Sequence, residues 1–237
     1  MARFVLLASP LLSPASWGST PFELGLLGHS AEAPAWPRLS SIRDGYYEGL
    51  AQGLVGEIGA GEAPILVAHS GAGALVPAVA ARIPLAGAVF VDALLPHPGR
   101  SWFDNAPPDF AAQLREGATE GKLPPWTEWW PPGALERLIP EAAQREALTA
   151  GLEPIPAAYF EEPAPRSEFS GPAAYIRLSG SYEEDASEAE RRGWPVMRLP
   201  LHHLAILTHG STVTAALHSA AEKLRGAPLQ GELSRSD

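Results

Sequence analysis

The sequence predicts an α/β fold in which a mostly parallel sheet carries helices on both faces. Short apolar runs alternate with longer, helix-like segments, as in proteins whose helices connect parallel strands. These runs are apolar throughout rather than at every second position, which is typical of strands covered on both sides. The chain has 237 residues, of which 46% are hydrophobic, and this is enough for one large core.

Each element of this fold is assigned from its local pattern. The first strand is expected at residues 4–8, because the apolar run ends at Ser9-Pro10. The other elements are expected as a helix at residues 41–58, strands at 65–68, 85–91 and 173–178, a helix at 183–192, a strand at 195–199 and a helix at 211–225. The polar residues 230–237 are expected to be frayed.

The segment of residues 96–172 differs from the rest of the chain. It is rich in proline and aromatic residues and contains no clear apolar strand. We therefore expect a helical cap, inserted after the strand that ends at Asp92. Residues 1–95 and 173–237 would then form the core domain.

The composition excludes several classes of function. The chain carries 27 acidic and 17 basic residues, a formal net charge of −10, so we expect no nucleic-acid partner. It has no cysteine, which rules out disulfides, Cys-based zinc sites and a thiol nucleophile and fits a cytoplasmic protein. No apolar run is long enough to cross a bilayer, so we expect no membrane partner. The oligomeric state is left open.

Ser70 is the candidate nucleophile. It directly follows the apolar residues 65–68 and precedes a helix-compatible segment, so the chain must turn sharply at this serine. Ala68 and Ala72, two positions to either side, leave room for the chain to fold back past itself. A serine hydroxyl is a poor nucleophile unless a histidine takes its proton and a carboxylate fixes the tautomer of that histidine. Both partners are therefore required.

The sequence offers two histidines and two acids for these roles. His202 and His203 lie between the last short strand and the last helix. Asp92 ends an apolar strand, and the carboxyl ends of parallel strands are where α/β proteins build their sites. Glu183 is the alternative acid, although its position also fits the first turn of a helix. A third possibility is an Asp92 that only binds loop amides.

Together, these segments resemble the α/β-hydrolase superfamily over almost the whole chain, and in particular its compact single-domain branch with plant-type esterases and hydroxynitrile lyases. The resemblance implies that Ser70 is the nucleophile and that His203 is the base, with His202 replacing a glycine common in that loop. In most relatives the acid follows the strand after the cap, but Ser179-Gly180-Ser181-Tyr182 stands there in this chain. Some relatives use an acid at the place of Asp92.

An acyl-transfer serine also needs backbone N–H groups that bind the developing oxyanion. The resemblance implies Gly71 as one donor and the loop after the first strand as the source of the other. Pro10 has no N–H group, so Leu11 is the predicted second donor, with Leu12 next. The alternative is a proline-rich turn that serves packing alone. No cofactor or metal is implied, because Gly71-Ala72-Gly73 lacks the Lys-Ser/Thr of a phosphate loop.

The cap is expected to determine the substrate. Trp126, Trp129 and Trp130 are predicted to form an apolar wall above Ser70, and His69 is expected to line the same pocket. The alternative is that these rings only fasten an irregular cap to the sheet. Because the cap has no basic cluster, uncharged substrates are expected.

Three functions are compatible with these residues. The first is a serine hydrolase that cleaves an ester, lactone or thioester of a small, largely apolar molecule through an acyl-enzyme. The second is a lyase or cyclase that uses the same residues as a proton shuttle. The third is a ligand-binding protein without catalytic activity, since fold does not establish function.

Overall fold

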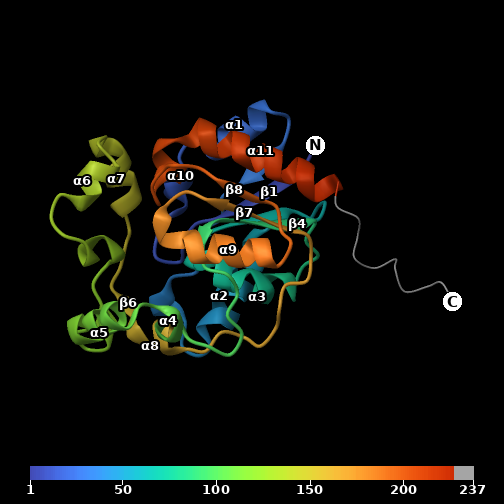
Figure 1. The fold of residues 1–237 in the computed structure, drawn as a ribbon. Coiled ribbons are helices and arrows are strands. Elements are labelled where there is room, and N and C mark those ends of the chain that lie inside the picture. Colours follow the sequence, from blue (N-terminus) through green and yellow to red (C-terminus); the bar gives the residue numbers. More distant parts are fainter. Residues whose placement is uncertain (227–237) are drawn as a thin grey trace.

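A computed structural model of the protein describes residues 1–226 (Figure 1). Its centre is a six-stranded sheet whose paired strands all run parallel. In spatial order the strands are β2 (Ser30–Glu32), β1 (Arg3–Leu7), β3 (Ile65–Ser70), β4 (Gly87–Ala93), β7 (Ala173–Arg177) and β8 (Val196–Arg198). This architecture confirms the predicted fold class. The expected frayed tail, residues 230–237, lies outside the described residues.

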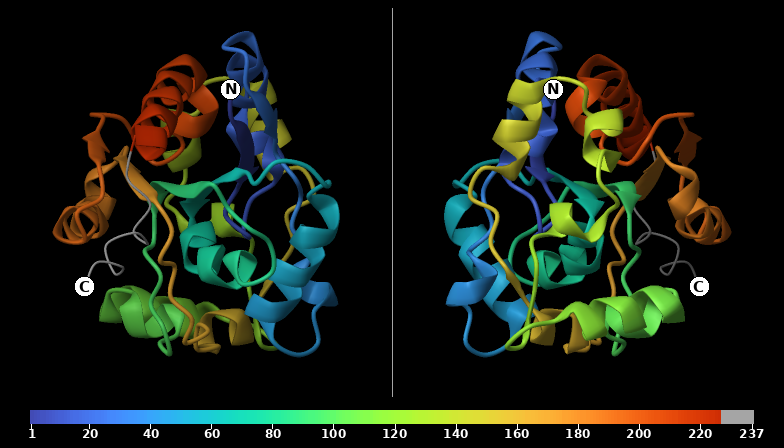
Figure 2. Two further views of the ribbon diagram at one scale, coloured as in Figure 1. Left: turned by 90° about the vertical axis from the view of Figure 1, so that its right-hand side faces the viewer. Right: turned by 90° about the vertical axis from the view of Figure 1, so that its left-hand side faces the viewer.

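Helices cover both faces of the sheet (Figures 1 and 2). Phe4 and Leu6 of β1 point into a core cluster on one side, where α1 (Thr20–Leu26) and α11 (Gly210–Gly226) pack. Val5 and Leu7 point into the opposite cluster, with α2 (Tyr46–Glu57), α3 (Val76–Ala80) and α9 (Glu183–Arg191). Because successive side chains of a strand alternate between the faces, both faces must be apolar. This explains the uninterrupted apolar runs in the sequence.

The structure differs from the expected elements at several places near the N-terminus, and the sequence analysis expected neither η1 (Pro14–Trp17) nor α1. The edge strand β2 has the sequence Ser-Ala-Glu and therefore lacks the apolar run that would predict a strand. The helix expected to begin at residue 41 begins at Tyr46, because Gly45 adopts a left-handed conformation with a φ of 69°. Leu39–Ser41 forms the separate 3-10 helix η2 instead.

Residues between β4 and β7 form short helices beside the sheet, at the left and lower left of Figure 1. These elements are α4 (Trp102–Asn105), α5 (Pro108–Gly117), η4 (Trp126–Trp129), α6 (Ala134–Leu138), α7 (Ala142–Thr149) and α8 (Ala157–Glu161). A two-stranded antiparallel sheet of β5 (Lys122–Leu123) and β6 (Ile155–Pro156) joins them and was not expected from the sequence. A third apolar cluster connects this region with Tyr47 and Leu75. Within the described residues, no helix has the length and apolarity that a membrane crossing needs.

Candidate active site

Ser70 lies at a sharp turn between β3 and the 3-10 helix η3 (Gly71–Leu75). Its backbone has φ 57° and ψ −128°, a strained conformation for a residue other than glycine. Ala68 and Ala72 are fully buried beside it, as the turn requires. The closest backbone approach is at Gly73, where a Cβ atom would lie 2.0 Å from the carbonyl oxygen of Leu94. Only glycine fits at that position.

Asp92 is also held in a strained conformation, at the end of β4. In the pairing of β3 with β4, His69 lies opposite Val91 and Ser70 opposite Ala93, so Asp92 is the extra residue of a β-bulge. Its φ is 45°. A bulge redirects the side chain of the extra residue, and bulges occur next to active sites for that reason.

The carboxylate of Asp92 is completely buried and fully hydrogen-bonded. Oδ1 accepts the backbone N–H groups of Leu178 and Ser179, both at 2.8 Å, and Oδ2 accepts the hydroxyl of Ser179 at 2.6 Å. The second partner of Oδ2 is Nδ1 of His203, at 2.8 Å. Burial by itself would raise the pKa of Asp92, but the hydrogen bonds from His203 and Ser179 lower it below the usual value. Asp92 is therefore ionised near neutral pH.

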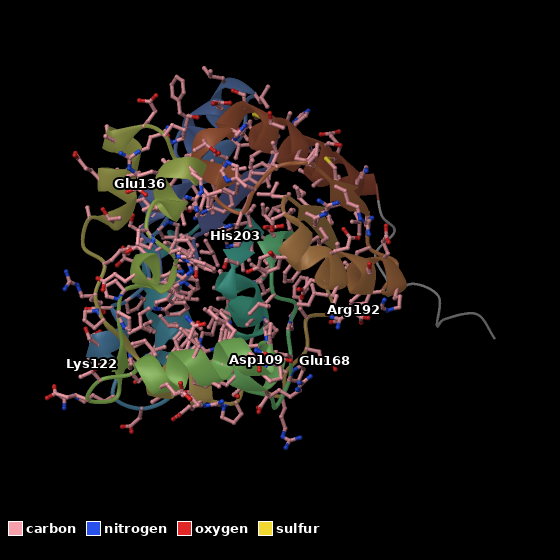
Figure 3. The ribbon with its side chains drawn as sticks, turned by 60° about the vertical axis from the view of Figure 1, so that its left-hand side comes forward. Asp109, Lys122, Glu136, Glu168, Arg192 and His203 are labelled. Atoms are coloured by element: carbon pink, nitrogen blue, oxygen red, sulfur yellow. The ribbon has the colours of Figure 1, made fainter. Side chains whose placement is uncertain are left out.

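His203 lies in the loop before α10 (Ala205–Thr208), and Figure 3 shows it near the middle of the molecule. Since the carboxylate can only accept, Nδ1 of His203 carries the hydrogen and Nε2 can receive a proton. The imidazole lies between two rings. Tyr182 stacks on it with a centroid distance of 5.0 Å and an interplanar angle of 9°, and His69 lies 4.5 Å away at 31°.

His69 holds the loop that carries His203. Its Nε2 donates to the carbonyl oxygen of His203 at 3.0 Å. The side chain has no exposed surface, and burial together with the neighbouring His203 lowers the pKa of His69 to about 3. A substrate would not reach His69 in this conformation, contrary to the expectation that it lines a pocket. The residue stays neutral beneath His203.

Tyr182 is a site residue that the sequence analysis did not single out. Its hydroxyl lies 3.3 Å from Oγ of Ser70. Among the described residues, it is the only hydrogen-bond partner of Ser70 Oγ. The only signal in the sequence was the place of Tyr182 in the segment 179–182, where most relatives would have the acid.

The loop after β1 lies against the turn at Ser70, as the oxyanion prediction requires. A Cβ atom on Gly71 would lie 3.5 Å from Oγ of Ser9 and 3.8 Å from Cδ of Pro10. The N–H of Leu11 makes a long contact of 3.4 Å with Oγ of Ser9, whereas the N–H of Leu12 bonds the carbonyl oxygen of Ser9 at 2.9 Å. Leu11 is thus the less firmly bound donor of the two.

The alternative residues have other partners. Glu183 forms ion pairs with Arg177 at 3.0 Å and with Arg198 at 2.9 Å. His202 lies 3.2 Å from the hydroxyl of Thr208, and burial lowers the pKa of His202. Neither residue forms a hydrogen bond with Ser70 or with the His203–Asp92 pair. Within residues 1–226, no group of three His, Asp or Glu side chains is placed to hold a metal ion.

The three tryptophans of the expected wall have different surroundings. Trp129 packs against Phe110 and Phe160 of the segment between β4 and β7, with centroid distances of 6.2 and 5.7 Å, and its indole N–H donates to the carbonyl oxygen of Pro124 at 2.8 Å. Trp130 is 42% exposed. Trp126 packs against both the third apolar cluster and the core cluster that contains Leu204, the neighbour of His203. Of the three tryptophans, it is therefore the one that contacts two of the apolar clusters.

A cavity of about 180 Å³ lies beside the candidate oxyanion loop. It is lined by residues 10–14, 35–39 and 151–153 and by Ile155, which are mostly apolar. Its two charged side chains, Arg38 and Glu153, lie 3.8 Å apart and neutralise each other. The cavity therefore suits an uncharged group.

No protein-family model matches the chain, and no curated protein matches its sequence. Solved structures, in contrast, match almost all of it. An extracellular α/β-hydrolase from a Paenibacillus species, which shares structural and functional homology with tobacco salicylic acid binding protein 2, has a TM-score of 0.75 and 21% identity and covers 93% of this chain and 99% of its own. The chain has the α/β-hydrolase fold.

Two further structures with the α/β-hydrolase fold are named for different activities, one as a hydrolase and one as a synthase. A pyrethroid hydrolase from Sphingobium faniae JZ-2 has a TM-score of 0.71 and 18% identity, with 93% of this chain and 97% of its own covered. Tomato methylketone synthase I, in complex with 2-tridecanone, has a TM-score of 0.70 and 17% identity, with 94% and 98% covered. At these identities the likeness establishes the fold and leaves the reaction to be argued from the site.

Proposed function

We propose that the protein is a serine hydrolase that cleaves an ester, lactone or thioester of a small, largely apolar substrate through an acyl-enzyme on Ser70. The observation that carries the proposal is the 2.8 Å pair of His203 Nδ1 and Asp92 Oδ2. This pair leaves Nε2 of His203 available as a base, and the Tyr182 ring that stacks on His203 carries its hydroxyl 3.3 Å from Oγ of Ser70. The hydrolases among the structures of the same fold support hydrolytic chemistry in general.

The proposed reaction uses these residues in turn. His203 Nε2 takes the proton of Ser70, and Oγ attacks the carbonyl carbon of the substrate. The N–H groups of Gly71 and Leu11 bind the oxyanion. His203 then returns the proton to the leaving oxygen or sulfur, and water releases the acyl group from Ser70 by the same steps. Asp92 stabilises the imidazolium and fixes its tautomer throughout.

The surroundings of the site favour an uncharged substrate. A cavity of about 180 Å³ is similar in size to an engineered apolar cavity of roughly 150 Å³ that binds benzene. Its wall includes Leu11, the proposed oxyanion donor, but neither Ser70 nor His203. The Arg38–Glu153 pair in its lining has no net charge to offer an anionic group.

Labelling with a fluorophosphonate, followed by mass-spectrometric mapping, tests the proposal. We expect one label on Ser70, none in Ser70→Ala, and a loss of turnover by several orders of magnitude in that variant. Turnover of a substrate without any label on Ser70 would point to the proton-shuttle lyase or cyclase instead. A folded protein that neither reacts with the label nor turns over esters would leave ligand binding as the function.

A further inference from the structure

Tyr182 contacts His203 with its ring and Ser70 with its hydroxyl. Its ring stacks on the imidazole of His203, and its hydroxyl lies 3.3 Å from Oγ of Ser70. The residue belongs to η5 (Gly180–Tyr182), directly after the segment that binds the carboxylate of Asp92. The loop that holds Asp92 in place therefore also carries a hydroxyl to the nucleophile.

The direction of the Tyr182–Ser70 hydrogen bond follows from the chemistry of the two groups. Burial raises the pKa of Tyr182 above its usual value, so its hydroxyl keeps its hydrogen at neutral pH. The hydrogen of Ser70 has to go to Nε2 of His203 for attack to begin. Only a bond in which Tyr182 donates leaves the hydrogen of Ser70 available for that transfer.

We propose that Tyr182 is a catalytic residue whose hydroxyl donates a hydrogen bond to Oγ of Ser70 whenever that oxygen carries negative charge. This inference rests on the proposed function of Ser70. During acylation His203 takes the proton of Ser70, Oγ forms its bond to the carbonyl carbon, and the carbonyl π electrons move to the oxyanion. Tyr182 keeps its own proton and stabilises the charge that develops on Oγ before this bond is complete.

The same contact serves the second half of the reaction. In deacylation His203 takes a proton from water, and the hydroxide attacks the acyl carbon. The bond between that carbon and Oγ then breaks, its electron pair returns to Oγ, and His203 gives Oγ a proton. Oγ is now the leaving group, and Tyr182 lies within hydrogen-bonding distance of it. One hydroxyl thus assists both half-reactions.

Tyr182→Phe distinguishes the effect of the hydroxyl from that of the ring, because it removes the hydroxyl and keeps the aromatic stacking on His203. The experiment measures the burst and the steady-state release of p-nitrophenol from a neutral p-nitrophenyl ester, together with the rate of fluorophosphonate labelling at Ser70. Tyr46→Phe is the matched control, since Tyr46 packs against Tyr159 in the third apolar cluster and is not among the hydrogen-bond partners of Ser70 or His203.

We expect Tyr182→Phe to slow the burst, the steady state and the labelling by about 10- to 100-fold each, with KM almost unchanged and the pH midpoints of the rate retained. Wild-type rates in folded Tyr182→Phe would overturn the role of the hydroxyl. So would a loss that comes with a shifted pH midpoint, because the change would then act through His203. A wild type that is not labelled at Ser70 would overturn the proposed function as well.

A second variant keeps the test decisive if Tyr182→Phe does not fold. Incorporation of 3-fluorotyrosine at position 182 retains the ring and the hydroxyl but makes the hydroxyl a stronger donor. Its acylation and deacylation rates should both differ from those of the wild type, by about twofold or more. Identical rates in both steps would overturn the proposal.

Discussion

The hydroxyl of Tyr175 binds both backbone groups of Ala93. It accepts the N–H of Ala93 at 3.0 Å and donates to its carbonyl oxygen at 2.7 Å. Ala93 directly follows Asp92, the extra residue of the bulge in β4. Tyr175 is itself buried in β7, so a neighbouring strand supports the backbone that directs the carboxylate of Asp92 towards His203.

Tyr175→Phe should therefore reduce both stability and activity. It leaves the N–H and carbonyl groups of Ala93 buried without this partner, which costs about 1–3 kcal/mol in the free energy of unfolding. Urea denaturation measures that loss, and kcat/KM for a neutral ester measures the effect on Asp92. Tyr46→Phe, which removes a hydroxyl that does not bond Ala93, is the control. An unchanged unfolding free energy would show that the bulge does not depend on this hydroxyl.

Asp92→Asn should lower kcat/KM by about 10³- to 10⁴-fold, because an amide neither fixes the tautomer of His203 nor stabilises the imidazolium. Glu183→Gln is the matched control, since it removes a carboxylate that pairs with Arg177 and Arg198 at the surface of α9. Exposed ion pairs contribute little to stability, so this change should have a small effect. A larger loss in Glu183→Gln than in Asp92→Asn would assign the acid to Glu183.

His69 should make the protein less stable in mild acid. Its pKa of about 3 in the folded state lies below the ordinary value of 6.5. Between these two values the unfolded chain binds a proton that the folded protein does not. The free energy of unfolding therefore falls as the pH decreases below 6.5, by up to about 1.4 kcal/mol per pH unit.

His69→Gln removes this contribution while it retains a hydrogen-bond donor for the carbonyl oxygen of His203. The other histidines are common to both proteins, so their effects cancel in the difference. Urea denaturation at about pH 7.5 and about pH 5.5 should show a flatter pH dependence for the variant. Parallel curves would mean that His69 is not held neutral in the folded protein.

Trp126 should affect substrate selection more than the other cap aromatics, because it packs against both the third apolar cluster and the core cluster that contains Leu204, the neighbour of His203. We expect the wild type to prefer neutral aryl or short acyl esters over coenzyme A thioesters and anionic esters. Trp126→Leu should raise KM for the neutral esters. Trp102→Leu is a matched change at the third apolar cluster, where Trp102 packs against Phe160 with a centroid distance of 4.9 Å. It should lower stability without that change in KM.

Either of two results would contradict this prediction. A preference for anionic esters would exclude an uncharged binding region. Equal KM values for Trp126→Leu and the wild type, in a folded protein, would limit Trp126 to the packing of the cap.

The sequence by itself determined the α/β fold class and led to Ser70, His203 and Asp92 as candidates. The reason is that burial on both faces requires continuous apolar strands, and a strand-to-helix turn requires small residues around Ser70. Both requirements concern residues that are neighbours in the chain, so the local sequence shows them. The sequence did not indicate where α2 begins, because that boundary depends on the left-handed conformation of Gly45. It did not indicate the edge strand β2 either, because this polar segment is a strand only through its pairing with β1.

Only the tertiary structure decided which residues meet. The contacts of Asp92 with His203, of Tyr182 with Ser70 and of His69 with the His203 carbonyl join residues more than a hundred positions apart. Such contacts depend on the register of the strands and on the bulge at Asp92, where one extra residue changes the direction of a side chain. Unlike the apolar residues of a strand or helix, a single carboxylate, hydroxyl or imidazole does not recur at a regular spacing that would identify its partner. Their partners are therefore set by the packing of the whole chain.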